Sequence, residues 1–226
     1  MGKLLDALDR LEIANNTLVI FSSDNGPARA REGHKLTLQN DSATGCGYGI
    51  AASKGITGGR KGYKACVFEG GIGVPFIARW PGMIAAGKVD KTSMISAVDL
   101  LPTFCELAGA RLPDDYQPDG VSQVAALQGV PFTTREKTLY WRTPGGNSKS
   151  PTHWAKHAIV DQQWKLLTSQ DNSRLELYDL VADPLEGENL ATAKPEIVES
   201  LLAKIEQWET TLPSEPDSSC FSKLRE

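Results

Sequence analysis

The sequence predicts an α/β region over residues 1–132, followed by a small antiparallel sheet with one packed helix over residues 133–226. In the first part, short continuous apolar runs alternate with segments of helical periodicity, which is typical of α/β folds. After a composition shift near residues 133–137, several strand-like runs are separated by polar turns, a pattern that predicts hairpins. A long amphipathic stretch beginning at Pro195 then predicts the helix, since proline is favoured at the first helical position.

The composition is that of an ordinary globular protein and excludes several functions. The 226 residues carry a net charge of −4 and are 40% hydrophobic. An acidic chain without a basic patch is not expected to bind nucleic acid. No apolar run approaches the ~18–20 residues of a membrane span, so no membrane span is expected. The four cysteines, Cys46, Cys66, Cys105 and Cys220, have no zinc-site spacing, and most are expected to be buried or free thiols.

The first elements lead towards a candidate site. Leucines 4, 5, 8 and 11 recur at helical spacing, and Asn15 and Asn16 close that helix. Residues 17–21 form a continuous apolar run that suits a strand buried on both faces, as in a parallel sheet between helices. Asp24-Asn25-Gly26-Pro27 follows at once and must turn the chain.

A glycine-rich stretch comes next, with 10 of the 21 glycines lying between Gly45 and Gly73. Such density indicates unusual backbone conformations or a close approach of the backbone to something else. Residues 74–80 read as a second strand. A helix is then expected from Asp99 as N-cap to Gly109 as the residue after its C-terminus, with mostly loop over 112–130.

The second part is predicted to contain four short strands, at 139–141, 158–160, 164–167 and 176–178. The helix that begins at Pro195 carries one apolar face. Its members are Ile197, Val198, Leu201, Leu202, Ile205 and Trp208.

Asp24 and Asn25 are the first candidate site residues. They follow a predicted buried strand, and in open α/β sheets ligands bind beyond the carboxyl ends of strands. Their oxygen atoms suit Ca²⁺ or Mg²⁺, although Asp-Asn-Gly-Pro is also good turn chemistry and a Ca²⁺ site takes ~6–8 ligands.

Lys64 is the second candidate, because a lysine among glycines can reach a tetrahedral anion as a point charge; a solvated surface lysine is the alternative. Its neighbours Arg60 and Lys61 are interpreted as surface residues. The three histidines, His34, His153 and His157, lack metal-ligand spacing and are interpreted as structural or surface residues.

Several segments in order resemble the sulfatase family, within the alkaline-phosphatase-like superfamily. The run 16–26, which ends in Asp24-Asn25-Gly26, resembles the family segment whose Asp-Asn pair binds the active-site metal. The run 61–82, with Glu69-Gly70-Gly71, resembles the segment in which a lysine five residues earlier contacts the substrate sulfate. Further likenesses lie at 96–109, 119–122, 164–166 and 176–190, so the resemblance covers nearly the whole chain and places it in the C-terminal portion of the family.

The resemblance implies a role for each candidate. Asp24 and Asn25 would be metal ligands, with Ca²⁺ as the cofactor or Mg²⁺ in its place, and Lys64 would contact the sulfate. The substrate would be a small-molecule sulfate ester or a sulfated glycan. The family tendency is a periplasmic or secreted protein, but the chain itself carries no signal that identifies a compartment.

The sequence also departs from the family pattern. The family makes its formylglycine nucleophile from a Cys/Ser-x-Pro/Ala-x-Arg motif, and none of the four cysteines has that context. That motif, the early metal-binding aspartates and a histidine would precede Met1, so the chain alone is expected not to hydrolyse sulfate esters. Gly73 stands where many relatives have arginine, which affects the details of the glycine-rich segment.

Two alternatives stand beside a portion of a sulfatase. One is a non-catalytic module derived from a sulfatase, which binds a partner or pairs with itself through an open sheet edge. The other is a phosphate or phosphonate ester hydrolase of the same superfamily. Asp24, Asn25 and Lys64 favour sulfate over phosphate.

Overall fold

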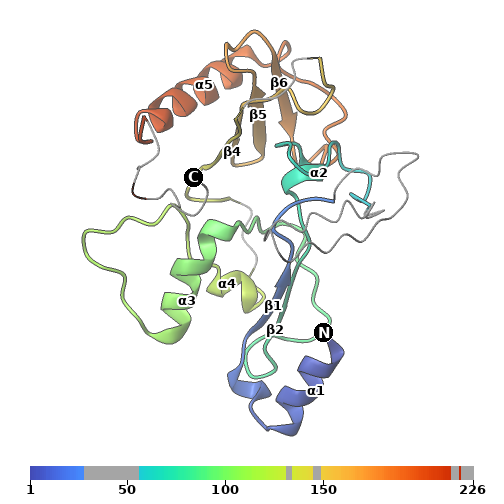
Figure 1. Cartoon of the computed structure of the whole chain (residues 1–226), viewed down its shortest axis with the longest axis vertical. Coiled ribbons are helices and arrows are strands. Elements are labelled where there is room, and N and C mark those ends of the chain that lie inside the picture. The colour runs from blue at the N-terminus through green and yellow to red at the C-terminus, as the bar shows by residue number, and fades with distance from the viewer. Residues whose placement is uncertain (28–55, 131–133, 145–148, 215–218, 220–226) are drawn as a thin grey trace.

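A computed structural model describes residues 1–27, 56–130, 134–144, 149–214 and 219, and shows a mixed α/β chain with two antiparallel sheets (Figure 1). The two-stranded sheet lies beside helices α1 and α3, and the four-stranded sheet lies at the other end with helix α5 across it (Figure 1). Short helix α2 lies between the two sheets. The glycine-rich residues before 56 fall outside the described residues.

The first sheet differs from the sequence prediction. After helix α1 (Gly2–Arg10) and a 3-10 turn (Ala14–Asn16), strand β1 (Val19–Ser22) pairs antiparallel with β2 (Phe76–Arg79). The prediction of a parallel strand buried on both faces was wrong for this chain. In a sheet of two strands each face has few neighbours, and Phe21 and its cross-strand partner Ile77 are 48% and 59% exposed.

The predicted helix after Asp99 is present as α3 (Leu100–Ala108), which ends at Gly109 in the left-handed conformation, φ 63°. Asp99 occupies the N-cap position but makes no side-chain cap to α3. Its carboxylate instead accepts hydrogen bonds from the backbone of Ser96 and Val121 and forms a buried ion pair with Arg135. The loop that follows contains one helical turn, α4 (Val124–Leu127).

The second sheet matches the prediction closely. Its strands are β3 (Leu139–Arg142), β4 (His157–Asp161), β5 (Trp164–Thr168) and β6 (Leu175–Asp179), in the order β3-β4-β5-β6 with every pair antiparallel. Both central strands, β4 and β5, are almost wholly buried, so apolar residues such as Ile159 and Leu167 occupy both faces.

Helix α5 (Pro195–Glu209) covers one face of this sheet. Val198, Leu201 and Ile205 are its buried residues, which confirms the predicted apolar face. They pack with Ile159, Leu166 and Leu177 from three strands. Trp208, near the end of the helix, stacks on Tyr140 of β3 with ring centroids 4.9 Å apart.

The opposite face of the sheet is covered by part of the glycine-rich stretch. Cys66, Val67 and Phe68 are buried in a cluster with residues of the second sheet and the segment before it. The other members of that cluster are Trp154, Ala155, Ala158, Leu167 and Tyr178. The segment that carries Lys64 thus packs on the second sheet, whose contacting residues lie about 100 positions later in the chain.

No helix within the described residues is long and apolar enough to cross a membrane.

Candidate active site

The turn after β1 presents Asp24 and Asn25 at the end of the strand. Asp24 is exposed, whereas Asn25 is partly buried. The Ser23 hydroxyl donates a 2.9 Å hydrogen bond to the Asn25 carbonyl and so helps to shape the turn. The side-chain oxygen Asn25 Oδ1 is buried and accepts no hydrogen bond. A buried acceptor without a partner is uncommon, and it leaves a lone pair available to a cation.

Two backbone hydrogen bonds bring this turn against the segment that carries Lys64. The Lys64 amide donates to the Pro27 carbonyl at 2.9 Å, and the Gly26 amide donates to the Gly71 carbonyl at 2.8 Å. The structure therefore brings Asp24, Asn25 and Lys64 into one region although about 40 positions separate them. The Lys64 side chain is exposed, as a residue that meets a soluble anion must be.

Glycine is required where the two segments meet. A Cβ added to Gly26 would lie 1.9 Å from the Gly70 carbonyl oxygen, and one added to Gly71 would lie 2.2 Å from the Cys66 carbonyl oxygen. Neither position could hold a side chain without moving the backbone. The glycines in this part of the stretch thus serve close approach of backbone to backbone.

Lys61 is an anchor of the segment, and its interpretation as a solvated surface residue was wrong. Its Nζ donates to Glu176 Oε2 at 2.9 Å and to the Tyr178 hydroxyl oxygen at 2.8 Å, both on β6. It also lies 4.5 Å from the centroid of the Phe68 ring. These partners lie more than 100 positions away, so no local sequence pattern could have shown them.

Glu176 is the charged centre of that anchor. Burial opposes its ionisation, but hydrogen bonds from Tyr178, Lys61 and Arg174 outweigh burial and lower its pKa. Tyr178 shows the converse effect, since burial and the neighbouring Glu176 carboxylate raise the pKa of its hydroxyl. The carboxylate therefore stays charged and the phenol stays neutral around neutral pH, which keeps the anchor intact.

The histidines fall into three different situations. His153 lies beside the site: its Nε2 is 3.1 Å from the Lys64 carbonyl oxygen, and its ring lies 4.5 Å from that of Tyr63. His157 is buried on β4, as a structural residue would be, 2.9 Å from Glu209. His34 lies outside the described residues.

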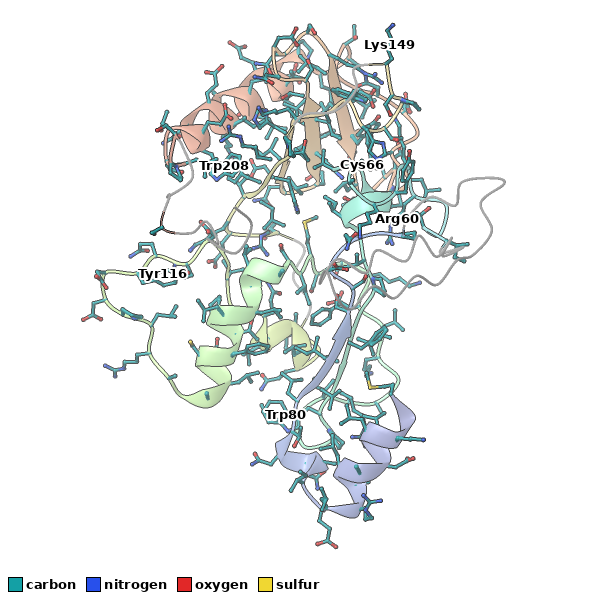
Figure 2. All side chains as sticks on the ribbon, viewed as in Figure 1. Arg60, Cys66, Trp80, Tyr116, Lys149 and Trp208 are labelled. Carbon is teal, nitrogen blue, oxygen red and sulfur yellow. The ribbon has the colours of Figure 1, made fainter. Side chains whose placement is uncertain are left out.

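Cys66 lies next to α2, on the side that faces the second sheet (Figure 2). Burial raises the pKa of its thiol, so it is held in its neutral, unreactive form. Cys66 and Cys105 are both free thiols, and Cys46 and Cys220 lie outside the described residues.

The residues present fit part of a cation site. Asp24 and Asn25 offer hard oxygen ligands, and Oδ1 of Asn25 lacks another partner. Over the described ranges there is no group of three or more His, Cys, Asp and Glu residues that could hold a metal. These two side chains would supply two of the ~6–8 oxygen ligands that Ca²⁺ takes.

A pocket of about 530 Å³ lies elsewhere, between the first sheet and α3. Its lining is largely apolar and includes Ile20, Trp80 and Phe104. None of the three candidate residues lines it, so the pocket is separate from the candidate site.

Comparison with known proteins identifies the family to which the chain belongs. Residues 60–211 match the family described as N-sulphoglucosamine sulphohydrolase, C-terminal, and residues 1–110 match the family described as Sulfatase. The structural neighbours include sulfatases of the alkaline-phosphatase-like fold. The chain belongs to the sulfatase family, a family of sulfuric ester hydrolases.

Several curated relatives align with most of the chain. Human steryl-sulfatase is 41% identical over 99% of this chain and 40% of its own length. An N-acetylgalactosamine-6-O-sulfatase of Bacteroides thetaiotaomicron is 29% identical over 93% of this chain and 40% of its own length. The chain thus spans about two fifths of the length of these relatives.

Solved structures give the same picture. Ps i-CgsB superposes with a TM-score of 0.67 at 25% identity, covering 92% of this chain and 39% of that one. The same protein has been crystallised in complex with k-i-k-neocarrahexaose. A Bacteroides thetaiotaomicron sulfatase from a locus for the metabolism of multiple glycosaminoglycans superposes with a TM-score of 0.65 at 27% identity, covering 92% of this chain and 42% of that one.

Proposed function

We propose that this chain supplies metal-binding and sulfate-contacting residues to the hydrolysis of sulfate esters. The observation that carries the proposal is the pair of hydrogen bonds, from Lys64 to Pro27 and from Gly26 to Gly71, that joins the Asp24-Asn25 turn to the lysine segment. Three side chains with the right chemistry for a cation and a sulfate group thereby share one region.

Each residue has a distinct role. Asp24 and the free acceptor Asn25 Oδ1 would hold Ca²⁺, or Mg²⁺ in its place, together with further oxygen ligands. A bound cation of this kind acts as a Lewis acid that stabilises negative charge on the ester group. Lys64 would hold the sulfate by its ammonium charge and orient the ester, a contribution of position and electrostatics.

The substrate belongs to the class of sulfate esters, either a small molecule or a sulfated glycan. Support for both comes from the similar proteins, which include a steryl-sulfatase, an N-acetylgalactosamine-6-O-sulfatase and Ps i-CgsB, which was crystallised with k-i-k-neocarrahexaose. The Lys64 ammonium is a compact positive charge that, unlike an arginine guanidinium, does not impose a fixed direction on its hydrogen bonds. It could therefore contact a sulfate group in either kind of substrate.

The 226-residue chain by itself is proposed to lack turnover. Its sequence contains no Cys/Ser-x-Pro/Ala-x-Arg motif from which the family's formylglycine could form. Metal-assisted hydrolysis needs the nucleophile together with the Lewis acid and the substrate contacts.

Titration calorimetry with Ca²⁺, followed by titration with inorganic sulfate, tests the site without requiring turnover. Asp24→Asn and Asn25→Ala are expected to weaken Ca²⁺ binding by about tenfold or more, because each removes a first ligand of a weak site. Lys64→Met is expected to weaken sulfate binding in the same way. Asp6→Asn and Lys88→Met, both at exposed positions, are the matched controls and should leave both affinities unchanged.

A chromogenic sulfate ester, supplied with Ca²⁺, completes this test. The chain is expected to show no hydrolysis. Hydrolysis that Lys64→Met abolishes would contradict the proposed inactivity while supporting the site. Ca²⁺ and sulfate affinities that none of the site variants alters would contradict the site itself.

Self-association is a second candidate function, favoured by the exposed apolar pair Phe21 and Ile77 on the first sheet. Sheets with unpaired edges and apolar faces invite pairing with another chain. The proposed occupant is a second copy of this chain, and sedimentation equilibrium would detect it. If the wild-type chain is a monomer at all concentrations and Phe21→Lys leaves its molecular mass in solution unchanged, this candidate is excluded.

A further inference from the structure

Lys165 is a charged residue in the interior of the second sheet. It lies on β5, and its side chain has no exposed surface. Its Nζ is 2.7 Å from Glu69 Oε1 and 2.8 Å from Glu186 Oε1. The side chain of Glu186 is also completely buried. The free energy lost when such charges leave water exceeds their electrostatic attraction unless the ion pair has good geometry. A protein with apolar residues in their place is often equally stable.

The two carboxylates do not belong to the sheet on which Lys165 lies. Glu69 is the first residue of α2 (Glu69–Ile72), in the glycine-rich segment, and Glu186 lies in the loop after β6. Glu186 Oε2 accepts a 2.7 Å hydrogen bond from the Glu69 amide, so the cluster holds both the side chain and the backbone of Glu69.

Backbone strain marks both ends of this arrangement. Glu186 has a φ of 58° and Ala65, next to Lys64, has a φ of 70°, values that non-glycine residues seldom adopt. Such conformations persist where surrounding contacts impose them. The buried pairing of Glu186 with Lys165 is such a contact.

A short path of hydrogen bonds leads from Glu69 to the candidate site. The Gly70 amide donates to the Lys61 carbonyl at 2.7 Å, and the Gly71 carbonyl accepts from the Gly26 amide at 2.8 Å. Gly26 belongs to the turn of Asp24 and Asn25, and the Lys64 amide closes the loop by donating to Pro27. A displacement of α2 away from the second sheet would therefore disturb the hydrogen bonds that join the turn to Gly71 and to Lys64.

We propose that Lys165 is a positioning residue: its ion pairs with Glu69 and Glu186 fix α2 on the second sheet and so hold Lys64 against the Asp24-Asn25 turn. A role of Lys165 in catalysis rests on the proposed function. The positional claim itself concerns the free chain and holds whether or not sulfate binds.

Amide hydrogen exchange of the 226-residue chain tests this position directly. In Lys165→Met, which keeps the length and removes the charge, the amides of Gly26 and Lys64 are expected to exchange about tenfold faster or more. The amides that pair β4 with β5 should keep their protection. Lys204→Met is the matched control, because Lys204 pairs with Asp161 of the same sheet far from α2, and it should leave Gly26 and Lys64 unchanged.

The alternative is that Lys165 only stabilises the fold. Unchanged exchange at Gly26 and Lys64 in a folded Lys165→Met chain would overturn the proposal. If that variant loses protection throughout, Glu69→Gln decides, since it leaves the Lys165–Glu186 pair in place. Faster exchange confined to Gly26 and Lys64 in Glu69→Gln supports positioning, and its absence overturns it.

Sulfate affinity separates this inference from the proposed function. Rapid exchange at Lys64 in Lys165→Met, in a chain whose wild type binds no sulfate, would uphold the positioning and remove the proposed function. If the wild type binds sulfate, its affinity for sulfate should fall in Lys165→Met. Lys165→Arg, which restores the charge, should recover part of that affinity.

Discussion

At the scale of single residues, the site depends on groups that look ordinary in the sequence. Asn25 Oδ1 is a buried acceptor without a hydrogen bond, a feature that requires an explanation in any structure. The cation proposed above would explain it, with the neighbouring Asp24 carboxylate as a second ligand. From the residues alone, the sequence left a plain turn as the alternative for Asp24-Asn25, and the resemblance to sulfatases then favoured the metal site.

Gly26→Ala tests the close approach on which the site depends. The added Cβ would meet the Gly70 carbonyl oxygen at 1.9 Å, so the turn must move away from the glycine-rich segment. We expect Ca²⁺ binding to weaken by about tenfold and the free energy of unfolding to fall by about 1–3 kcal/mol, as overpacking typically costs. Urea denaturation and calorimetry measure the two effects.

Gly2→Ala is the control for this variant. A Cβ at Gly2 meets nothing within 4 Å, so stability should stay within about 1 kcal/mol of the wild type and Ca²⁺ affinity should not change. A Gly26→Ala chain that binds Ca²⁺ as tightly as the wild type would show that the contact between the turn and Gly70 is unimportant for the site.

At the scale of secondary structure elements, the sequence predicted the second part well. The four strands and α5 follow from local apolar periodicity and from Pro195, which are signals contained in the segments themselves. The antiparallel pairing of β1 with β2 was not predictable in this way. A continuous apolar run such as 17–21 indicates a strand but carries no information on the direction or number of its neighbours.

The long-range contacts were missed for the same reason. Lys61 was interpreted as a surface residue and Lys165 was given no role of its own. Their partners were not visible in the local sequence, because Glu176 and Glu69 lie about 100 positions away and Glu186 belongs to another element. A lysine within an otherwise apolar strand, as in Trp164-Lys165-Leu166-Leu167, was the one available signal, since buried lysine is rare unless paired.

Docking of α5 on the second sheet gives a pH dependence. His157 on β4 is buried beside Glu209 of α5, with Lys156 and Arg142 as its other charged neighbours. Burial lowers its pKa, against the opposing attraction of Glu209. The unfolded chain therefore takes up a proton at a higher pH than the folded one, so this contribution to stability is complete above about pH 6.5 and is lost as the pH falls through the lowered folded pKa.

His157→Gln removes that titration and isolates its effect. We expect the stability difference between the wild type and His157→Gln, measured by urea denaturation, to change in favour of the variant as the pH falls from about 7 to 5. The carboxylates of the chain contribute equally to both proteins and cancel in this comparison. Parallel stability curves over this range would show that His157 does not titrate differently in the folded state.

At the scale of the whole molecule, the parts predicted on either side of residue 132 are joined around the candidate site. Residues of the glycine-rich segment pack on the second sheet, and the same segment contacts the turn after β1. A buried bidentate ion pair between Asp99 and Arg135 adds a second connection, with the Arg135 nitrogens 2.5 and 2.8 Å from the carboxylate oxygens. A site built where two parts meet is sensitive to the position of each.

The most direct measurement is a crystal structure of the 226-residue chain grown with Ca²⁺ and inorganic sulfate. We expect Ca²⁺ at about 2.3–2.6 Å from Asp24 and from Asn25 Oδ1, with water completing its coordination. Sulfate should lie within hydrogen-bond distance of Lys64 Nζ. Both ions located elsewhere, with Asn25 Oδ1 still without a partner, would contradict the assignment of this region as the metal and sulfate site.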